Sequence, residues 1–202
     1  MNSKFFLILV LLICAGFTSA DAQSISKFAK EKQIELGGSI GISSQTYVSN
    51  GEYDNESTTN ISFSPYAGYF VTDGFEIGIM PTVSYTKYGG SGHLTDYTIY
   101  LAPAYNFDTK SNLYPYVMGF IGYNGVDYSY GSGVTGIAWG GEAGLKIHAF
   151  GSGLIKIGLS YELKTLGRGS TTAYEFGSYG NSSGRNGYDL LKLNVGFNVF
   201  LH

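Results

Sequence analysis

The sequence predicts an all-β protein, an eight-stranded antiparallel up-and-down transmembrane β-barrel. Three observations predict this fold. Apolar and polar residues alternate along eight segments, the connections between these segments alternate in length, and the N-terminus has the pattern of an export signal. No helical period competes with the alternation after residue 32.

The N-terminus predicts a secretory signal peptide that is removed on export. Lys4 precedes an apolar run from Phe5 to Ala15, and Ala20-Asp21-Ala22 has the small-x-small pattern of a cleavage site. The apolar run is shorter than the ~20 residues that a membrane-spanning helix needs. We therefore expect a leader over 1–22, a short periplasmic segment over 23–32 and a barrel domain over 33–202.

Composition excludes several classes of function. Cys14 is the only cysteine and lies in the leader, so we expect neither disulfides nor zinc-cysteine sites in the exported chain. Charged residues make up only 13% of the chain, and the net charge of −3 offers no basic surface for nucleic acid. Three scattered histidines do not indicate a metal site, and nothing in the sequence indicates a cofactor.

The eight segments repeat with the period of two that strands show when their two faces meet different surroundings. In the seventh segment, for example, Ile155, Ile157 and Leu159 alternate with Lys156 and Gly158. The fifth segment alternates only weakly. In chain order, the segments cover residues 34–43, 61–71, 75–86, 96–107, 113–123, 137–148, 155–164 and 191–201.

Connections of two kinds join these segments. Three are tight and contain the turn-forming residues Asp, Asn or Gly, at residues 72–74, 108–112 and 151–153. Four are predicted to be longer polar loops, at residues 49–60, 89–95, 124–136 and 165–187, and the first of these carries the acidic residues Glu52, Asp54 and Glu56. This order is that of a meander whose tight turns lie at one end and whose long loops lie at the other.

Residue size indicates which face is inside. The polar face holds mostly Gly, Ser, Ala, Thr and Asn, which fit a narrow eight-stranded cylinder, while the other face is built of bulky Ile, Leu, Val and Phe. A polar face exposed to water, as in a soluble ligand carrier, would contain more Lys and Glu. Four prolines, Pro65, Pro81, Pro103 and Pro115, are expected near strand ends or at bulges, because each lacks a ladder donor.

The chain resembles the small outer-membrane β-barrel proteins typified by OmpX and the membrane domain of OmpA. The resemblance covers residues 33–202 and lies in the eight segments, the stretches Leu113-Tyr-Pro-Tyr-Val-Met-Gly-Phe-Ile-Gly-Tyr123 and Trp139-Gly-Gly-Glu-Ala-Gly-Leu-Lys146, and a last strand that runs nearly to the C-terminus. It implies a monomer in the outer membrane of a Gram-negative bacterium. Its partners would be outer-membrane lipid, lipopolysaccharide and, during biogenesis, the barrel-insertion machinery.

Eight charged residues have the parity of the lumen, with equal numbers of each sign. Buried charges must be paired or hydrated, so they predict either a network that fills the interior or the lining of a weak pore. These residues are Glu35, Glu76, Glu142, Lys146, Lys156, Glu162, Lys164 and Lys192.

The loop between the last two segments is the candidate external binding site. Its Arg168, Tyr174, Phe176 and Tyr179 stand among Gly and Ser, a composition suited to binding a surface protein partner. No histidine lies on the lipid-facing parity close to a serine and a carboxylate, so no catalytic site is predicted. We therefore expect a non-enzymatic outer-membrane protein with a structural or adhesion-like role, and the alternative is a small porin for water, ions or small solutes.

Overall fold

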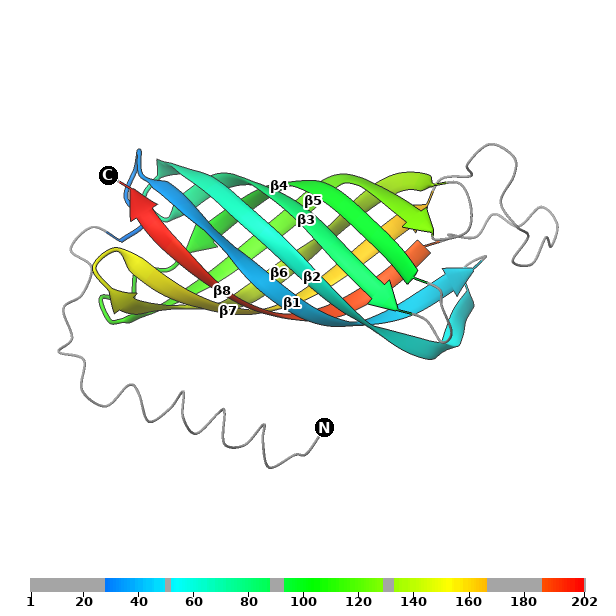
Figure 1. The fold of residues 1–202 in the computed structure, drawn as a ribbon. Coiled ribbons are helices and arrows are strands. Elements are labelled where there is room, and N and C mark those ends of the chain that lie inside the picture. The colour runs from blue at the N-terminus through cyan, green and yellow to red at the C-terminus, as the bar shows by residue number, and fades with distance from the viewer. Residues whose placement is uncertain (1–27, 50–51, 88–92, 129–132, 167–186, 202) are drawn as a thin grey trace, which may run out of the picture.

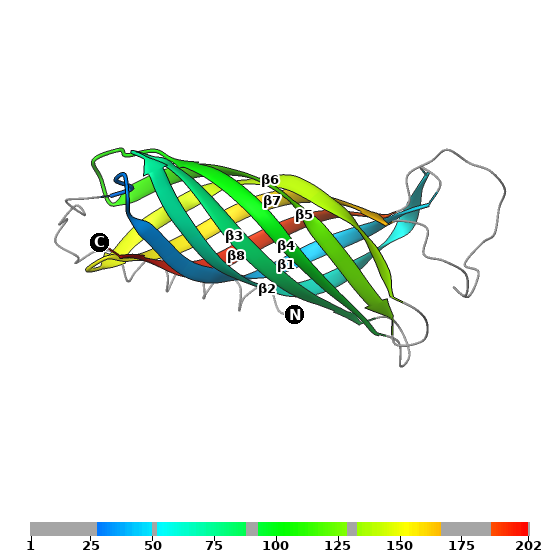
Figure 2. The same cartoon turned by 90° about the horizontal axis from the view of Figure 1, so that it is seen from above.

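The computed structural model describes residues 28–49, 52–87, 93–128, 133–166 and 187–201. They form eight strands that close into one barrel, longer than it is wide, with the strands steeply tilted around it (Figures 1 and 2). The strands are β1 (Ile34–Ser49), β2 (Glu52–Thr72), β3 (Phe75–Lys87), β4 (His93–Asn106), β5 (Leu113–Tyr128), β6 (Val134–Phe150), β7 (Gly153–Leu166) and β8 (Gly187–Leu201).

Each strand pairs antiparallel with its neighbours in sequence, and β1 pairs with β8 to close the wall. The closing register runs from Ile34 opposite Leu201 to Val48 opposite Gly187. A closed wall pairs the backbone of every strand on both sides, as a sheet in hydrocarbon requires. The predicted eight-stranded up-and-down barrel is confirmed.

The tight turns and the two ends of the barrel sheet lie together, at what we call the turn end of the barrel (Figure 1). Gly74 and Gly151 adopt positive φ angles of 79° and 54° in two of these turns, a conformation that glycine adopts at little cost. The opposite end, where β1 meets β2 and β7 meets β8, is called the loop end.

Several residues predicted as loops at the loop end belong to strands. β1 continues to Ser49 and β2 begins at Glu52, so most of the predicted loop 49–60 belongs to the β1–β2 hairpin. Glu52 pairs with Ser49, whereas residues 54–56 fall in a register shift between Tyr53 and Ser57. Likewise, β5 continues to Tyr128 and β6 begins at Val134, so both strands extend into the predicted loop 124–136. The sequence did not reveal these extensions because outward-facing positions there, such as Asp127 and Thr135, are polar, so the alternation with an apolar outer face stops.

The outer wall is a belt of large apolar side chains. Along β4, outward-facing Ile99 is 65% exposed, while the next residue, Tyr100, points inward and is 1% exposed. The same alternation leaves exposed Ile, Leu, Val and aromatic side chains on every strand. So large an apolar surface is unstable in water and suits hydrocarbon, which makes this a transmembrane barrel. Among the described residues, no helix is long and apolar enough to cross a membrane.

The prediction that the prolines lie within a few residues of strand ends or at bulges is wrong for two of them. Pro65 and Pro81 lie well inside β2 and β3 at opposing register positions, and the ladder is interrupted there, between Phe63 opposite Val83 and Ala67 opposite Ile79. Pro103 lies inside β4 opposite Gly119, at a second interruption. Because Pro65 and Pro81 oppose each other, their two missing donors affect a single site in the wall.

Candidate functional site

The lumen is the candidate site, because all eight charged residues predicted to face it are buried there and form ion pairs with one another or with Asp96. They lie in three clusters stacked along the barrel. Their side chains come from β1, β3, β4, β6, β7 and β8, so the network ties together strands that are far apart in sequence.

The first cluster lies toward the turn end and is centred on Lys146 of β6. Its ammonium is 2.6 Å from Glu35 Oε2 and 3.3 Å from Glu76 Oε1. Asn198 Nδ2 donates to the other oxygen of Glu35, and Asn106 Nδ2 donates to Glu76 Oε1 over 2.8 Å. One lysine therefore holds two carboxylates, and amide donors supplement it.

The second cluster is centred on Glu142, also on β6. Lys156 Nζ lies 2.8 Å from Glu142 Oε1, which also accepts from the Tyr116 hydroxyl, and Asn194 Nδ2 donates to Oε2 over 2.6 Å. The same ammonium lies over the ring of Tyr116, 5.1 Å from its centroid, and over that of Tyr66 at 5.8 Å. Hydrogen bonds and aromatic faces together replace the water that this pair lost on burial.

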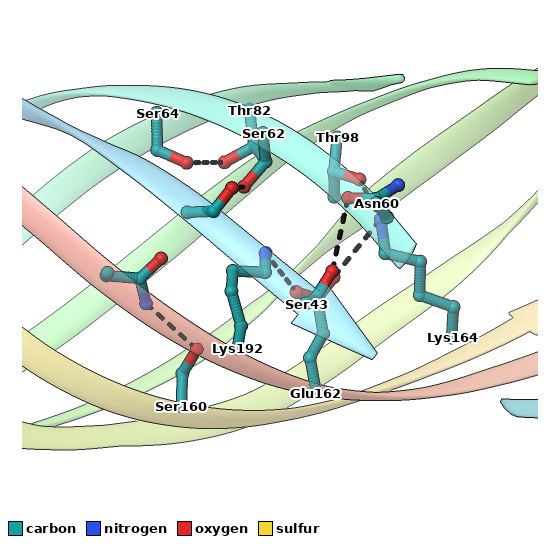
Figure 3. A network of polar contacts seen from close by, with 12 residues as sticks. Ser43, Asn60, Ser62, Ser64, Thr82, Thr98, Ser160, Glu162, Lys164 and Lys192 are labelled. Atoms are coloured by element: carbon teal, nitrogen blue, oxygen red, sulfur yellow. Dashed lines mark hydrogen bonds and ion pairs between the residues drawn. The ribbon is translucent and has the colours of Figure 1, made fainter. Parts of the chain in front are cut away.

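The third cluster lies nearest the loop end and surrounds Glu162. Lys192 and Lys164 reach it from two sides, over 2.9 and 3.2 Å (Figure 3), and the Tyr100 hydroxyl donates to it as well. Lys164 also lies 2.6 Å from Asp96. Asp96 was missed as a network member, although its parity in the fourth segment places it on the lumen face.

The lumen also holds a continuous apolar cluster, carried by β2 to β6, and we call the part of the lumen that this cluster fills the apolar half. The charged network adjoins it, because the Tyr100 and Tyr116 hydroxyls of the cluster donate to Glu162 and Glu142. The expectation that mainly small residues fill the interior is thus only partly correct. The cluster consists of Tyr66, Met80, Tyr100, Ala102, Ala104, Tyr116, Met118, Phe120 and Ala138.

Apolar side chains also close both ends. Leu94, Val126, Tyr188 and Leu190 pack together at the loop end. At the turn end the corresponding cluster is made by Phe28, Ala29, Phe70, Tyr114, Leu154 and Phe200. Phe200, the aromatic residue near the C-terminus, therefore points into the barrel, and its neighbour Leu201 faces outward.

Residues 28–33 form a strap across the turn end, which the sequence did not predict. The Phe28 ring stacks on Tyr114 with centroids 3.6 Å apart and meets Phe200 edge-on at 5.4 Å. The backbone of the strap is bonded as well, since Gly74 N donates to Ala29 O over 2.7 Å and Lys32 N donates to Phe70 O over 2.8 Å. No periodic pattern marks so short a segment, although Phe28 is an apolar residue in an otherwise polar stretch.

Little free space remains between the second and third clusters. A cavity there, lined by Ser64, Glu142, Glu162, Lys192 and Asn194 among others, measures about 10 Å³. That is close to the room that one water molecule needs. The centre of the lumen is therefore filled by side chains.

Among the described residues, no group of three or more His, Cys, Asp or Glu side chains is placed to hold a metal ion. His148 lies at a tight turn, where its Nε2 is 2.9 Å from Gly151 O, and His93 stacks on the Tyr85 ring. The predicted binding loop with Arg168, Tyr174, Phe176 and Tyr179 lies outside the described residues.

Removing the central lysine of the first cluster should be costly. In Lys146→Met, Glu35 and Glu76 would face each other without a cation, and we expect a loss of about 3–5 kcal/mol in the free energy of unfolding, measured with urea in lipid vesicles. The triple variant Glu35→Gln/Glu76→Gln/Lys146→Met should regain most of that loss. Lys110→Met, in an exposed turn, is the matched control and should change little; an equal effect of both lysine variants would contradict this role.

The strap should loosen in acid. The Glu31 amide and the Lys30 ammonium, each 2.9 Å from Asp73, hold the pKa of that carboxyl below its ordinary 3.8. Because the pKa of Asp73 is lowered in the folded state, the stability that its bonds to the strap contribute is fully present above pH 3.8. That stability is lost as the pH falls through the lowered pKa. The NMR shift of the Glu31 amide should follow this titration and become insensitive in Asp73→Asn. An unchanged titration in that variant would refute the assignment.

Comparison with known proteins relates the chain to others by fold. A scan of protein-family models gives no match, and neither does a search of curated proteins. Among solved structures, Neisserial surface protein A matches with a TM-score of 0.64 at 17% identity, over 84% of this chain and 99% of that one. OprG from Pseudomonas aeruginosa (TM-score 0.49, 15% identity, 89% and 100%) and Ail, the attachment invasion locus protein of Yersinia pestis (0.43, 14%, 85% and 99%), also match. The match to Neisserial surface protein A, together with the closed eight-stranded topology, shows that the chain has the fold of the small eight-stranded outer-membrane barrels.

Proposed function

We propose that this chain is a non-conducting, non-enzymatic protein of the outer membrane, exported with a cleaved leader, whose role is structural and lies in surface interactions at its loop end. The filled lumen is the observation that supports this most. A pore needs a continuous path for water, whereas here three ion-pair clusters lie between two apolar closures.

The pairing of the charges supports a plug rather than a pore lining. Each of the four lumen lysines lies within 3.3 Å of a carboxylate oxygen. Separating such a pair in a narrow, poorly hydrated cylinder would leave an uncompensated buried charge. The clusters therefore resist the rearrangement that an ion path would require.

The loop end offers a projecting platform for a partner. β2 pairs with β1 as far as Glu52 opposite Ser49, but with β3 only as far as Asn60 opposite Thr86. The β1–β2 hairpin consequently extends past β3 at the loop end, the end at which β7 stops at Leu166 and β8 starts at Gly187 (Figure 1). We propose that residues 167–186, which connect β7 and β8, make the surface interaction, with Arg168, Tyr174, Phe176 and Tyr179 as contacts.

The remaining partners follow from this setting. The apolar belt would contact outer-membrane lipid and lipopolysaccharide, and the barrel-insertion machinery would assemble the chain as a monomer. The surface partner would be a protein, since aromatic residues and arginine are the side chains that protein interfaces favour.

Conductance tests the closed lumen. The purified barrel, shown to be folded by a gel mobility that changes on boiling, should give little conductance in planar bilayers and no liposome swelling with small sugars. The ion pairs and end clusters must all rearrange before solute can pass. Large, steady, solute-permeable channels would instead favour the porin alternative.

Deleting Ser170 to Gly184 tests the surface role. The deletion leaves β7 and β8 whole, so the barrel should fold with an unchanged gel shift, while binding of barrel-expressing cells to protein-coated surfaces should fall. The point variant Tyr174→Ala/Phe176→Ala/Tyr179→Ala keeps the loop length and should have the same direction of effect. Unchanged binding by both variants would exclude this segment as the contact.

A further inference from the structure

The four prolines weaken only two of the eight seams between strands. In an antiparallel pair, the backbone groups of successive residues point alternately toward one neighbouring strand and the other. Asn106 N donates to Gly74 O across the β3–β4 seam. The backbone groups of even-numbered residues in β3 and β4 therefore point toward this seam, and those of odd-numbered residues point away from it. The backbone nitrogen of Pro81 therefore points toward β2, and that of Pro103 points toward β5. Phe70 N donates to Gln33 O, so the backbone groups of even-numbered residues in β2 point toward β1. By the same alternation, the backbone nitrogen of Pro65 points toward β3.

The missing bonds are thus concentrated on both sides of the β3–β4 pair. Pro65 and Pro81 would exchange two hydrogen bonds, and neither forms because both residues lack the donor. Across the β4–β5 seam, Pro103 cannot donate a hydrogen bond to Gly119. At the end of the same seam, Pro115 O accepts from Phe107 N, but Pro115 has no N–H to donate in return. Unpaired carbonyls in a hydrocarbon setting cost several kcal/mol in general, so such a cluster is an unusual feature of a membrane wall.

The weakened seams border the apolar half of the lumen. Tyr66 and Met80 lie beside the first interruption, and Ala102, Met118 and Phe120 lie beside the second; all five belong to the apolar cluster. The seams on the other side of the barrel, from β6–β7 through β8–β1, contain no proline. An opening at either weak seam would therefore join bilayer hydrocarbon to an apolar interior.

We propose that the β3–β4 pair is a lateral entry through which one hydrocarbon chain of a lipid or fatty acid inserts from the bilayer into the apolar half of the lumen. Met80 and Met118 can yield space, because their unbranched side chains adopt many shapes at low cost. Gly119 is exposed on the outer face opposite Pro103, and a Cβ there would meet no atom within 4 Å, so no side chain blocks the approach to this seam from the bilayer. This inference stands apart from the surface role, since it involves neither the loop end nor a solute path.

The alternation of the strands makes the test direct. The probe is a fatty acid with a photoreactive diazirine at its chain end, in phosphatidylcholine nanodiscs that hold the full barrel. After irradiation, mass spectrometry should find adducts on inward-facing Met80 and Met118 as well as on outward-facing Ile79. Adducts confined to outward-facing positions in the wild-type chain would overturn the proposal.

Restoring the donors should close the entry. In Pro65→Ala/Pro81→Ala two ladder bonds become possible, and inward adducts should fall by about tenfold or more while those on Ile79 stay unchanged. Amide exchange at Ala67 and Ile79 should slow in parallel. Pro115→Ala, at the end of a seam, is the matched control. If the double variant fails to fold, Pro103→Ala is the second variant, because it restores the donor in the β4–β5 seam. Inward adducts that persist in every folded variant would also refute the entry.

Discussion

Closure of the wall is the constraint on which the rest of this structure depends. Only when β1 pairs with β8 do the outer strands lose their free edges, and hydrocarbon offers no other partner for their backbone groups. Eight strands enclose a cylinder too narrow for bulk water and too wide to stay empty. The interior must therefore be filled by side chains from the wall itself, and the charged clusters and aromatic residues are this filling.

The filling in turn stabilises the closed wall. Lys146 and Glu35 are separated by 111 residues, and Asn198 and Glu35 by 163. Each of these contacts forms only after distant strands have come together in the correct register. A one-residue slip of any strand would turn the charges of that strand toward lipid and its aliphatic residues toward the lumen, so the clusters specify the register as strictly as the apolar belt does.

The sequence predicted the features that depend on parity and missed those that depend on register. Alternation was sufficient to assign Glu142 and Lys156 to the lumen, but only the shear of the closed barrel brings Tyr116 and Asn194 to the same carboxylate. Asp96 had the correct parity, but nothing in the sequence pairs it with Lys164. The strand extensions at the loop end were missed because backbone pairing continues where the apolar–polar alternation stops. The opposed positions of Pro65 and Pro81 were missed because they depend on the register between two strands, which the sequence of one strand does not define.

The strap has a consequence for the order of assembly. Its binding site is made by Phe70, Tyr114, Leu154 and Phe200, which come from four strands that include the last one to be synthesised. Phe28, although it precedes every strand, has nowhere to dock until β8 has arrived. The first described residues of the chain are thus among the last to settle, and a seated strap marks a finished barrel.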